Sequence, residues 1–167
     1  MYLPKHFDEP RIEVMHALMQ AYPLATLVIN SPDGLDANHL PLQLLADTTP
    51  LGTLRGHIAR ANPLSKITNG TLEVLVIFQG ADSYISPSWY PTKHETGKAV
   101  PTWNYATVHA HGTLRIINDS DWIRAQIEAL TTQMESPLPQ PWSVSDAPAD
   151  YIEKMLGAVT GIEITIS

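Results

Sequence analysis

The segment from Asn104 to Ile117 constrains the fold more than any other, because apolar and polar residues alternate along it without a break. Successive side chains of a β-strand point to opposite faces of a sheet, so a period of two is typical of a strand. One face carries Ala106, Val108, Ala110, Gly112, Leu114 and Ile116, and the other carries Tyr105, Thr107, His109, His111, Thr113 and Arg115. The pattern therefore predicts one long strand with a dry face and a wet face.

Further apolar and β-branched segments predict the strands that would pair with it. These segments are Leu24–Asn30, His39–Ala46, Thr53–Ile58, Leu72–Gln79, a short strand at Tyr84 and Ile85, and a last strand with Ile162, Ile164 and Ile166. The turn residues Ser31 to Gly34 predict a hairpin between the first two. The nearly continuous apolar run from Leu72 to Gln79 predicts burial on both of its faces.

Helical spacing of apolar residues predicts a smaller number of helices. The first would be capped by Asp8, with Pro10 in its first turn, and would end at Pro23. The second would begin at Asp119 or Ser120, and a short third helix would precede Gly157. The fold class predicted from these elements is mainly β with peripheral helices, as an antiparallel barrel whose closure removes the sheet edges.

Composition narrows the classes of function. The chain of 167 residues predicts a single domain over 1–167, with a proline-rich surface loop at 136–148. A net charge of −7 argues against nucleic-acid binding, and the absence of cysteine excludes disulfides and thiolate metal sites. No apolar run has the length of a membrane span, and the first residues do not resemble a signal peptide, so we expect a soluble, cytoplasmic protein.

The motif GHIARANP at residues 56–63 is the first candidate site. Asn62 is a good helix N-cap and Pro63 suits the first helical position, so free backbone N–H groups would favour an anion there. Arg60 could add a guanidinium that matches a phosphate. The alternative is that Asn62 and Pro63 only start a helix and that Arg60 is a solvated surface residue.

The segment from Pro87 to Thr102 is the second candidate, because long loops in compact domains are often functional. Trp89, Tyr90 and Trp103 could cover a ring system, and Lys93 and Lys98 bring positive charge. The alternative is a hydrophobic cluster beneath a loop.

Histidines are the third candidate. His109 and His111 share one strand face, but no carboxylate follows them closely enough to complete a metal site, so we expect none. The alternative is that they line the wet side of the strand. No Gly-x-Ser-x-Gly nucleophile elbow occurs, and the catalytic residues, if any, are unknown.

Five motifs together resemble the PaiB-type FMN-binding negative transcriptional regulators. They are MYLPKHF at 1–7, NHLPLQL at 38–44, GHIARANP at 56–63, YISPSWY at 84–90 and VPTWNYATVHAHG at 100–112, which span nearly the whole chain. The resemblance implies a flavin split barrel, similar to pyridoxamine-phosphate oxidases and flavin reductases, that forms homodimers with FMN between the subunits.

The resemblance also implies positions for the flavin site. Arg60 and Asn62 would lie at the phosphate, and His57, His39 and Leu40 would lie nearer the ribityl chain or the ring. Trp103 and Tyr105 would lie near the flavin, contributed by either the same or the neighbouring subunit. Family members continue past the final GIEITI-like strand into a basic Lys-Ser-Gln-Asn segment, which this sequence lacks.

The function expected from the resemblance is that of an FMN-binding homodimer related to transcriptional regulators, without direct DNA binding. One alternative is an FMN-dependent oxidoreductase, in which the flavin supplies the redox chemistry. A second is a haem-handling split barrel that uses one of the seven histidines as an axial ligand.

Overall fold

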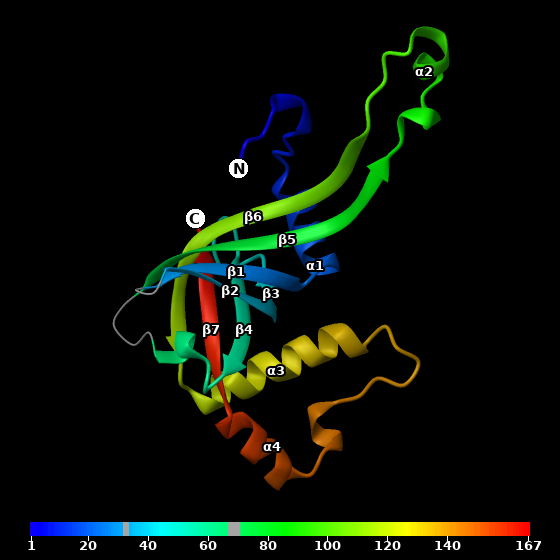
Figure 1. The fold of residues 1–167 in the computed structure, drawn as a ribbon. Helices are drawn as coiled ribbons and strands as arrows, with labels where there is room; N and C mark the ends of the chain where they lie inside the picture. The colour runs from blue at the N-terminus through cyan, green and yellow to red at the C-terminus, as the bar shows by residue number, and fades with distance from the viewer. Residues whose placement is uncertain (32–33, 67–70) are drawn as a thin grey trace.

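A computed structural model describes residues 1–31, 34–66 and 71–167. A seven-stranded antiparallel sheet forms its centre, in the order β2-β1-β5-β6-β7-β4-β3 (Figure 1). The strands are β1 Leu24–Ser31, β2 Gly34–Pro41, β3 Gln43–Leu45, β4 Thr53–Ala59, β5 Leu72–Ile85, β6 Thr102–Ile117 and β7 Val159–Ile166. The predicted mainly-β class is confirmed.

The sheet curls on itself because one stretch of chain belongs to both of its edges. β2 pairs with β1 at one edge, and after Leu42 the chain continues as β3, which pairs with β4 at the other edge. Leu42 is buried, and its backbone N–H donates to the Pro23 carbonyl oxygen at 2.9 Å. β2 also comes alongside β4, so the sheet forms a barrel. The predicted strand His39–Ala46 is therefore wrong in its bounds, since pairing with β1 extends β2 back to Gly34 and the chain bends at Leu42.

The barrel interior holds one apolar core. Every second residue of β1, β5 and β7 points into it, as the period of a strand requires. Its members include Leu27, Leu54, Val76, Phe78, Ile162 and Ile164. On β5, Leu75 and Ile77 are only half-buried, so the prediction that both faces of this strand are buried is wrong. β6 alternates as predicted from Ala110 to Leu114.

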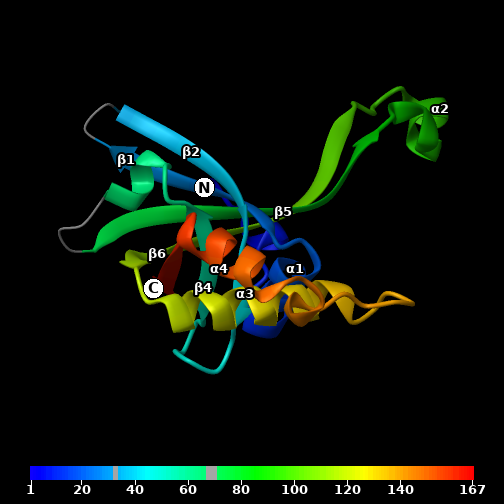
Figure 2. The ribbon, with the colours of Figure 1, turned by 90° about the horizontal axis from the view of Figure 1, so that it is seen from below.

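Helices α1, α3 and α4 pack on the outside of the barrel, whereas α2 lies at the far end of the β5–β6 projection (Figure 1). The α-helices are α1 Ile12–Ala21, α2 Pro91–Thr96, α3 Ser120–Glu135 and α4 Ala149–Gly157, and the 3₁₀ helices are η1 Lys5–Phe7, η2 Pro63–Lys66, η3 Pro87–Trp89 and η4 Val144–Asp146. The side chain of Asp119 accepts from the Trp122 N–H at 2.9 Å, which confirms the predicted cap of α3. The predicted cap at Asp8 is wrong, because Asp8 follows η1 and α1 starts only after Arg11. α3 and α4 lie side by side at one end of the barrel (Figure 2).

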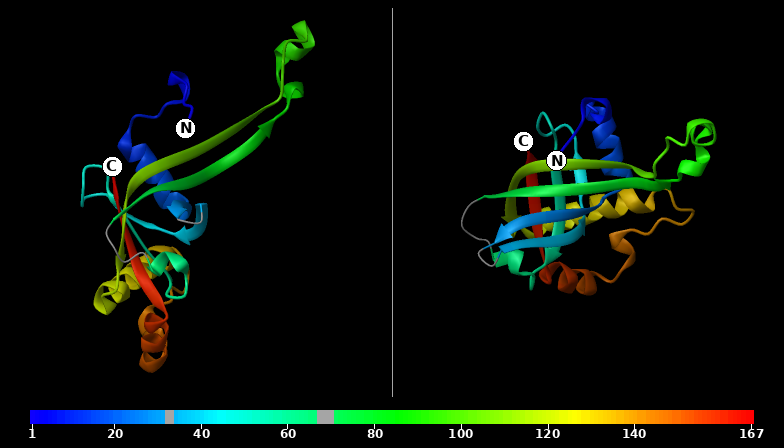
Figure 3. Two further views of the ribbon diagram at one scale, coloured as in Figure 1. Left: turned by 60° about the vertical axis from the view of Figure 1, so that its left-hand side comes forward. Right: turned by 45° about the horizontal axis from the view of Figure 1, so that its top comes forward.

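β5 and β6 continue beyond the barrel as a two-stranded projection (Figure 3). A bulge between Gln79 and Asp82 separates the barrel part of β5 from the outer part, in which Asp82–Ile85 pairs with Thr102–Tyr105. We call residues 82–105 the arm. The separate strand predicted at Tyr84 and Ile85 is wrong, because these residues continue β5. The loop predicted between Pro87 and Thr102 contains η3 and α2.

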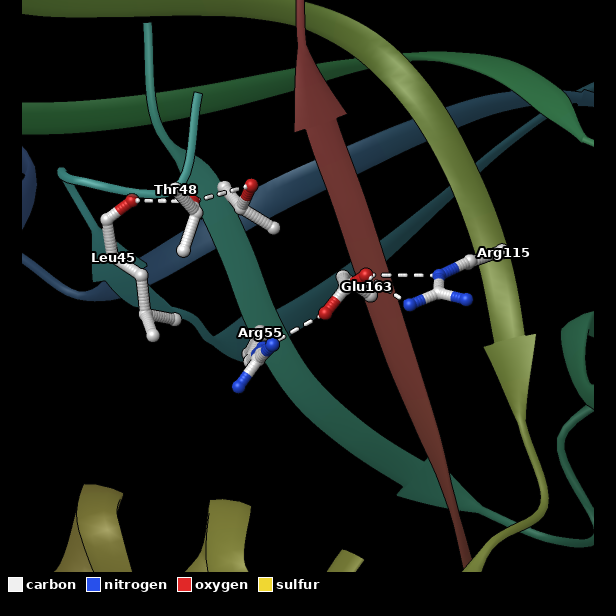
Figure 4. Close-up of polar contacts among 6 residues, drawn as sticks. Leu45, Thr48, Arg55, Arg115 and Glu163 are labelled. Atoms are coloured by element: carbon white, nitrogen blue, oxygen red, sulfur yellow. Dashed lines mark hydrogen bonds and ion pairs between the residues drawn. The ribbon is translucent and has the colours of Figure 1, made fainter. Parts of the chain in front are cut away.

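An ionic group joins three neighbouring strands on the outer face of the barrel (Figure 4). Glu163 on β7 accepts from Arg55 Nε on β4 at 2.8 Å and from Arg115 Nη2 on β6 at 2.5 Å. The Arg55 guanidinium also lies over the Trp122 ring of α3, 5.3 Å from its centroid. Burial raises the pKa of the Glu163 carboxyl, but the hydrogen bonds from Arg115 and Arg55 outweigh it, so the pKa lies below its ordinary value.

The predicted turn from Ser31 to Gly34 includes residues 32 and 33, which lie outside the described residues. Its two flanking strands do form the predicted hairpin of β1 and β2. Within the described part of the chain, no helix combines the length and the apolar character needed to cross a membrane.

Candidate functional site

The Asn62 side chain caps η2, as the sequence predicts. Its Oδ1 accepts from the Leu64 N–H at 2.9 Å, and Pro63 occupies the first helical position. The helix that follows is a four-residue 3₁₀ helix, so its aligned peptide dipoles are few. An anion at this point would therefore depend on side chains as well as on backbone N–H groups.

Asn62 also joins the end of β4 to β2. Its Nδ2 donates to Asn38 Oδ1 at 2.7 Å, while the Nδ2 of Asn38 is buried and has no hydrogen-bond partner among the described residues. A buried amide donor without a partner is unusual and indicates a missing ligand or water. Asn38 lies in the NHLPLQL motif, but no signal in the sequence places it opposite Asn62.

His39 and Leu40 point to opposite sides of β2. Leu40 is buried in the barrel core, whereas His39 is exposed and its Nδ1 lies 3.0 Å from Thr26 Oγ1 on β1. The structure thus brings Asn38, Leu40 and Asn62 to one end of the barrel and places the His39 ring on its outer face.

Arg60 has partners in the structure that the sequence does not predict. Its Nε donates to the Gly157 carbonyl oxygen at 3.0 Å, its Nη2 to the Val159 carbonyl oxygen at 2.7 Å, and its Nη1 to Asn118 Oδ1 at 3.3 Å. The guanidinium therefore ties the end of β4 to the α4–β7 junction. Each Nη atom keeps one further N–H, because a guanidinium carries five donors.

His57 lies on the α3 side of β4. Leu54 and Ile58 of this strand enter the core, so the alternate residues Arg55 and His57 face α3. His57 Nδ1 lies 2.8 Å from Gln126 Oε1. This placement favours a role at the α3 interface over the predicted contact with a flavin.

Trp103 and Tyr105 lie far from these groups in the same chain. Both stand on the arm, with 59% and 65% of their surface exposed, and Trp103 packs edge-on against Tyr84 at 5.8 Å between ring centroids. Tyr105 stands on the arm and the Arg60 partner Asn118 follows the other end of β6, so the path between them along this curved strand is roughly 40 Å at about 3.3 Å per residue. Through Leu27 and Val76, Asn38 lies level with Ala110 of β6, on the barrel side of Tyr105. The predicted site residues thus form two separate groups.

His109 and His111 lie on β6 between the two groups. Burial, the charged amino terminus and His111 lower the pKa of His109, which favours its neutral form near pH 7. Among residues 1–31, 34–66 and 71–167, no three histidine, aspartate or glutamate side chains form a group that could hold a metal ion.

The family described as "Putative FMN-binding domain" matches residues 1–167, the full length of the chain. The chain belongs to this FMN-binding family. The resemblance predicted from the GHIARANP and VPTWNY motifs is confirmed.

Relatives in fungi and bacteria support the same assignment. The chain is 37% identical to the uncharacterized protein AN0679 of Emericella nidulans, over 99% of this chain and 80% of that protein. It is 36% identical to the uncharacterized protein YKL070W of Saccharomyces cerevisiae, over 84% of this chain and 94% of that protein. It is 28% identical to the protease synthase and sporulation protein PAI 2 of Bacillus subtilis, over 99% of this chain and 77% of that protein.

Solved structures share the fold at low sequence identity. The FAD and heme binding protein of Mycobacterium smegmatis matches with a TM-score of 0.65 at 17% identity, over 95% of this chain and 68% of that one. The flavocytochrome Anf3 of Azotobacter vinelandii matches with a TM-score of 0.62 at 14% identity, over 99% of this chain and 69% of that one. The predicted split-barrel fold is thereby confirmed.

Proposed function

We propose that the chain binds FMN as a homodimer in which each flavin site is built from two subunits. One subunit supplies the barrel end with Asn38, Arg60 and Asn62, and the arm of the other subunit supplies Trp103 and Tyr105. Membership of the FMN-binding family over residues 1–167 supports the ligand. The exposure of Trp103 and Tyr105 on the arm, outside the barrel, is the observation that supports a shared site, because these rings have no covering surface within their own subunit.

Exposed apolar side chains support the second subunit. The arm exposes Trp89, Tyr90, Val100, Trp103 and Tyr105, and the segment before α1 exposes Tyr2 and Phe7. Monomeric proteins rarely leave so many large apolar groups in water, and such surfaces mark interaction sites. A two-fold partner that receives the arm would cover them.

The barrel end has suitable groups for the polar half of FMN. The free N–H groups on the two Nη atoms of Arg60 would donate to the phosphate through charge-assisted bonds. The unpartnered Nδ2 of Asn38 would donate to a ribityl or phosphate oxygen. Leu40 and the exposed His39 would border this region.

The proposed role in regulation is indirect, within the cytoplasm. PAI 2 is a sporulation protein by name, but the net charge of −7 opposes contact with DNA phosphates in this chain. On α3 the one arginine is paired, since Arg124 contacts both Glu128 and Glu153. A regulatory effect would therefore act through the flavin, another ligand or a protein partner.

The first experiment is an FMN titration with riboflavin as the matched ligand. Freshly purified protein should show flavin absorbance or acquire it after FMN addition and desalting, and a flat visible spectrum would contradict the proposal. Arg60→Ala should weaken FMN roughly 10- to 100-fold and leave riboflavin nearly unchanged, because riboflavin has no phosphate. Equal loss for both ligands would show that Arg60 acts only through its bonds to Gly157 and Val159.

A further inference from the structure

A cavity of about 180 Å³ lies between α3, α4 and the outer face of the sheet. Its apolar lining comes from both helices, from the loop before α4 and from the start of β7. The lining side chains are Ile127, Trp142, Val144, Ile152, Met155, Leu156 and Val159. An apolar cavity of about 150 Å³ accommodates one benzene molecule, so this space suits a single six-membered ring with one substituent.

His57 contributes one polar ring nitrogen to the lining of the cavity. The ring lines the cavity, and its Nδ1 is held by Gln126 Oε1 at 2.8 Å. This contact occupies Nδ1 and leaves Nε2 as the ring nitrogen that can meet a ligand. Nε2 has no hydrogen-bond partner in the part of the chain that the structure describes. The cavity thus offers one ring nitrogen that can form a hydrogen bond to a ligand.

Gln126, the hydrogen-bond partner of His57, carries a second polar side-chain atom that is buried. Its side chain is 3% exposed, and its Nε2 has no hydrogen-bond partner among the described residues. Burying an unpaired donor is unfavourable, and such groups in folded proteins usually meet a water or a ligand. Gln126 therefore fixes the orientation of the His57 ring through its Oε1.

Arg124 is the other polar side chain that lines the cavity, and it does not favour the binding of an anion there. Arg124 contacts Glu153 on α4 and lies 4.0 Å from Glu128 on α3, so its charge is compensated. Trp142, which also lines the cavity, keeps 45% of its surface exposed in the proline-rich loop, where its backbone N–H donates to Glu135 Oε2 at 2.9 Å. The indole offers a flat apolar surface for a ring.

We propose that this cavity binds a small uncharged aromatic molecule with one hydroxyl group. The ring packs against Trp142 and the apolar side chains of α4, and the hydroxyl forms a hydrogen bond with His57 Nε2. This site goes beyond the proposed flavin function and does not depend on it, because neither Asn38 nor Asn62 lines the cavity.

The test uses phenol as the probe and toluene as its apolar match, with the full chain as purified. Binding is followed by the indole N–H signal of Trp142 in ¹H–¹⁵N spectra, assigned with Trp142→Phe. Phenol should bind roughly tenfold more tightly than toluene, the value of one hydrogen bond to the His57 ring nitrogen. Equal affinities, or no phenol binding at millimolar concentration, would overturn the proposal.

Two variants separate the cavity from its hydrogen bond. His57→Phe should bind phenol and toluene equally, whereas Ile152→Trp should fill the space and abolish binding of both. Leu24→Trp is the control, because Leu24 lines a different surface hollow with Tyr22 and Gln79. Phenol binding that survives Ile152→Trp, or that is lost in Leu24→Trp, would place the ligand elsewhere and refute the site.

Discussion

The barrel and the arm share strands β5 and β6 but differ in whether they bury the apolar residues of these strands. Inside the barrel, β5 buries Val74, Val76 and Phe78 against the other strands. Beyond the bulge, the same pair of strands carries Tyr84, Trp103 and Tyr105 with large exposed surfaces. The first arrangement is complete within one chain, whereas the second lacks a covering surface. Under the proposed dimer, the barrel serves folding and the arm serves association.

The largest expected effect is in the barrel core. Phe78→Ala should lower the free energy of unfolding by about 3 to 5 kcal/mol, because Phe78 is fully buried. Trp89→Ala in the arm is the matched control and should change it by less than about 0.5 kcal/mol. Urea denaturation followed by circular dichroism, at a concentration where the protein is monomeric, measures both. Similar losses would mean that the arm belongs to the folding unit.

The next effect concerns the ionic group on the outer face of the barrel. Glu163→Gln should cost about 2 to 3 kcal/mol above pH 4.5, because it removes charge-assisted bonds to Arg55 and Arg115 from a carboxylate that is 6% exposed. The folded pKa is lowered, so this stabilisation is present above the unfolded pKa and is lost as the pH falls through the folded pKa.

The pH dependence checks the cause of that loss. In urea denaturation across a pH series, the difference between wild type and Glu163→Gln should shrink below pH 4.5. A difference that stays constant through the acidic range would assign the loss to packing rather than to charge.

A smaller effect is expected where α3 meets the sheet. A Cβ at Gly161 would lie 2.5 Å from the Trp122 ring, so Gly161→Ala should cost about 1 to 3 kcal/mol through overpacking. Gly157→Ala is the control, since nothing lies within 4 Å of its Cβ position and alanine favours a helix. Thermal denaturation should move in opposite directions for the two variants, and a shared direction would contradict this packing.

The smallest effect on stability should come from removing the arm tip. Ile85 pairs with Thr102, so an Asn-Gly turn can replace residues 86–101 and close the hairpin. The free energy of unfolding of the monomer should change by less than about 0.5 kcal/mol, because no tip residue belongs to the core. The dimer should weaken, as sedimentation equilibrium would show. A tip deletion that dimerises like wild type would remove α2 and η3 from the proposed interface.

The elements of the barrel could be predicted from the sequence because their signals are local. Alternation predicts β6, and Asp119 predicts the start of α3. The course of β5 beyond Gln79 could not be predicted from the sequence, because Gly80 and Asp82 are poor strand residues and their strand conformation depends on pairing with β6. The first half of β2 could not be predicted either, because it contains Asp36 and Asn38, which are poor strand residues.

The candidate site likewise combines local contacts, which the sequence predicts, with long-range contacts, which it does not. The cap at Asn62 is local and was predictable. The Asn38–Asn62 bond depends on how the barrel closes, and the bonds of Arg60 reach Gly157 and Val159, nearly a hundred residues along the chain. Such contacts are set by topology, which local patterns do not encode.

The shared flavin site is tested most directly by mixing two defective variants. Asn62→Ala lacks the barrel half of the site and Trp103→Ala lacks the arm half, so each alone should bind FMN weakly. If each site joins two subunits, subunit exchange in an equal mixture should restore tight FMN binding at about a quarter of the sites, since half of the dimers are mixed and each of these holds one intact site. A mixture that binds no more FMN than the separate variants would contradict the shared site.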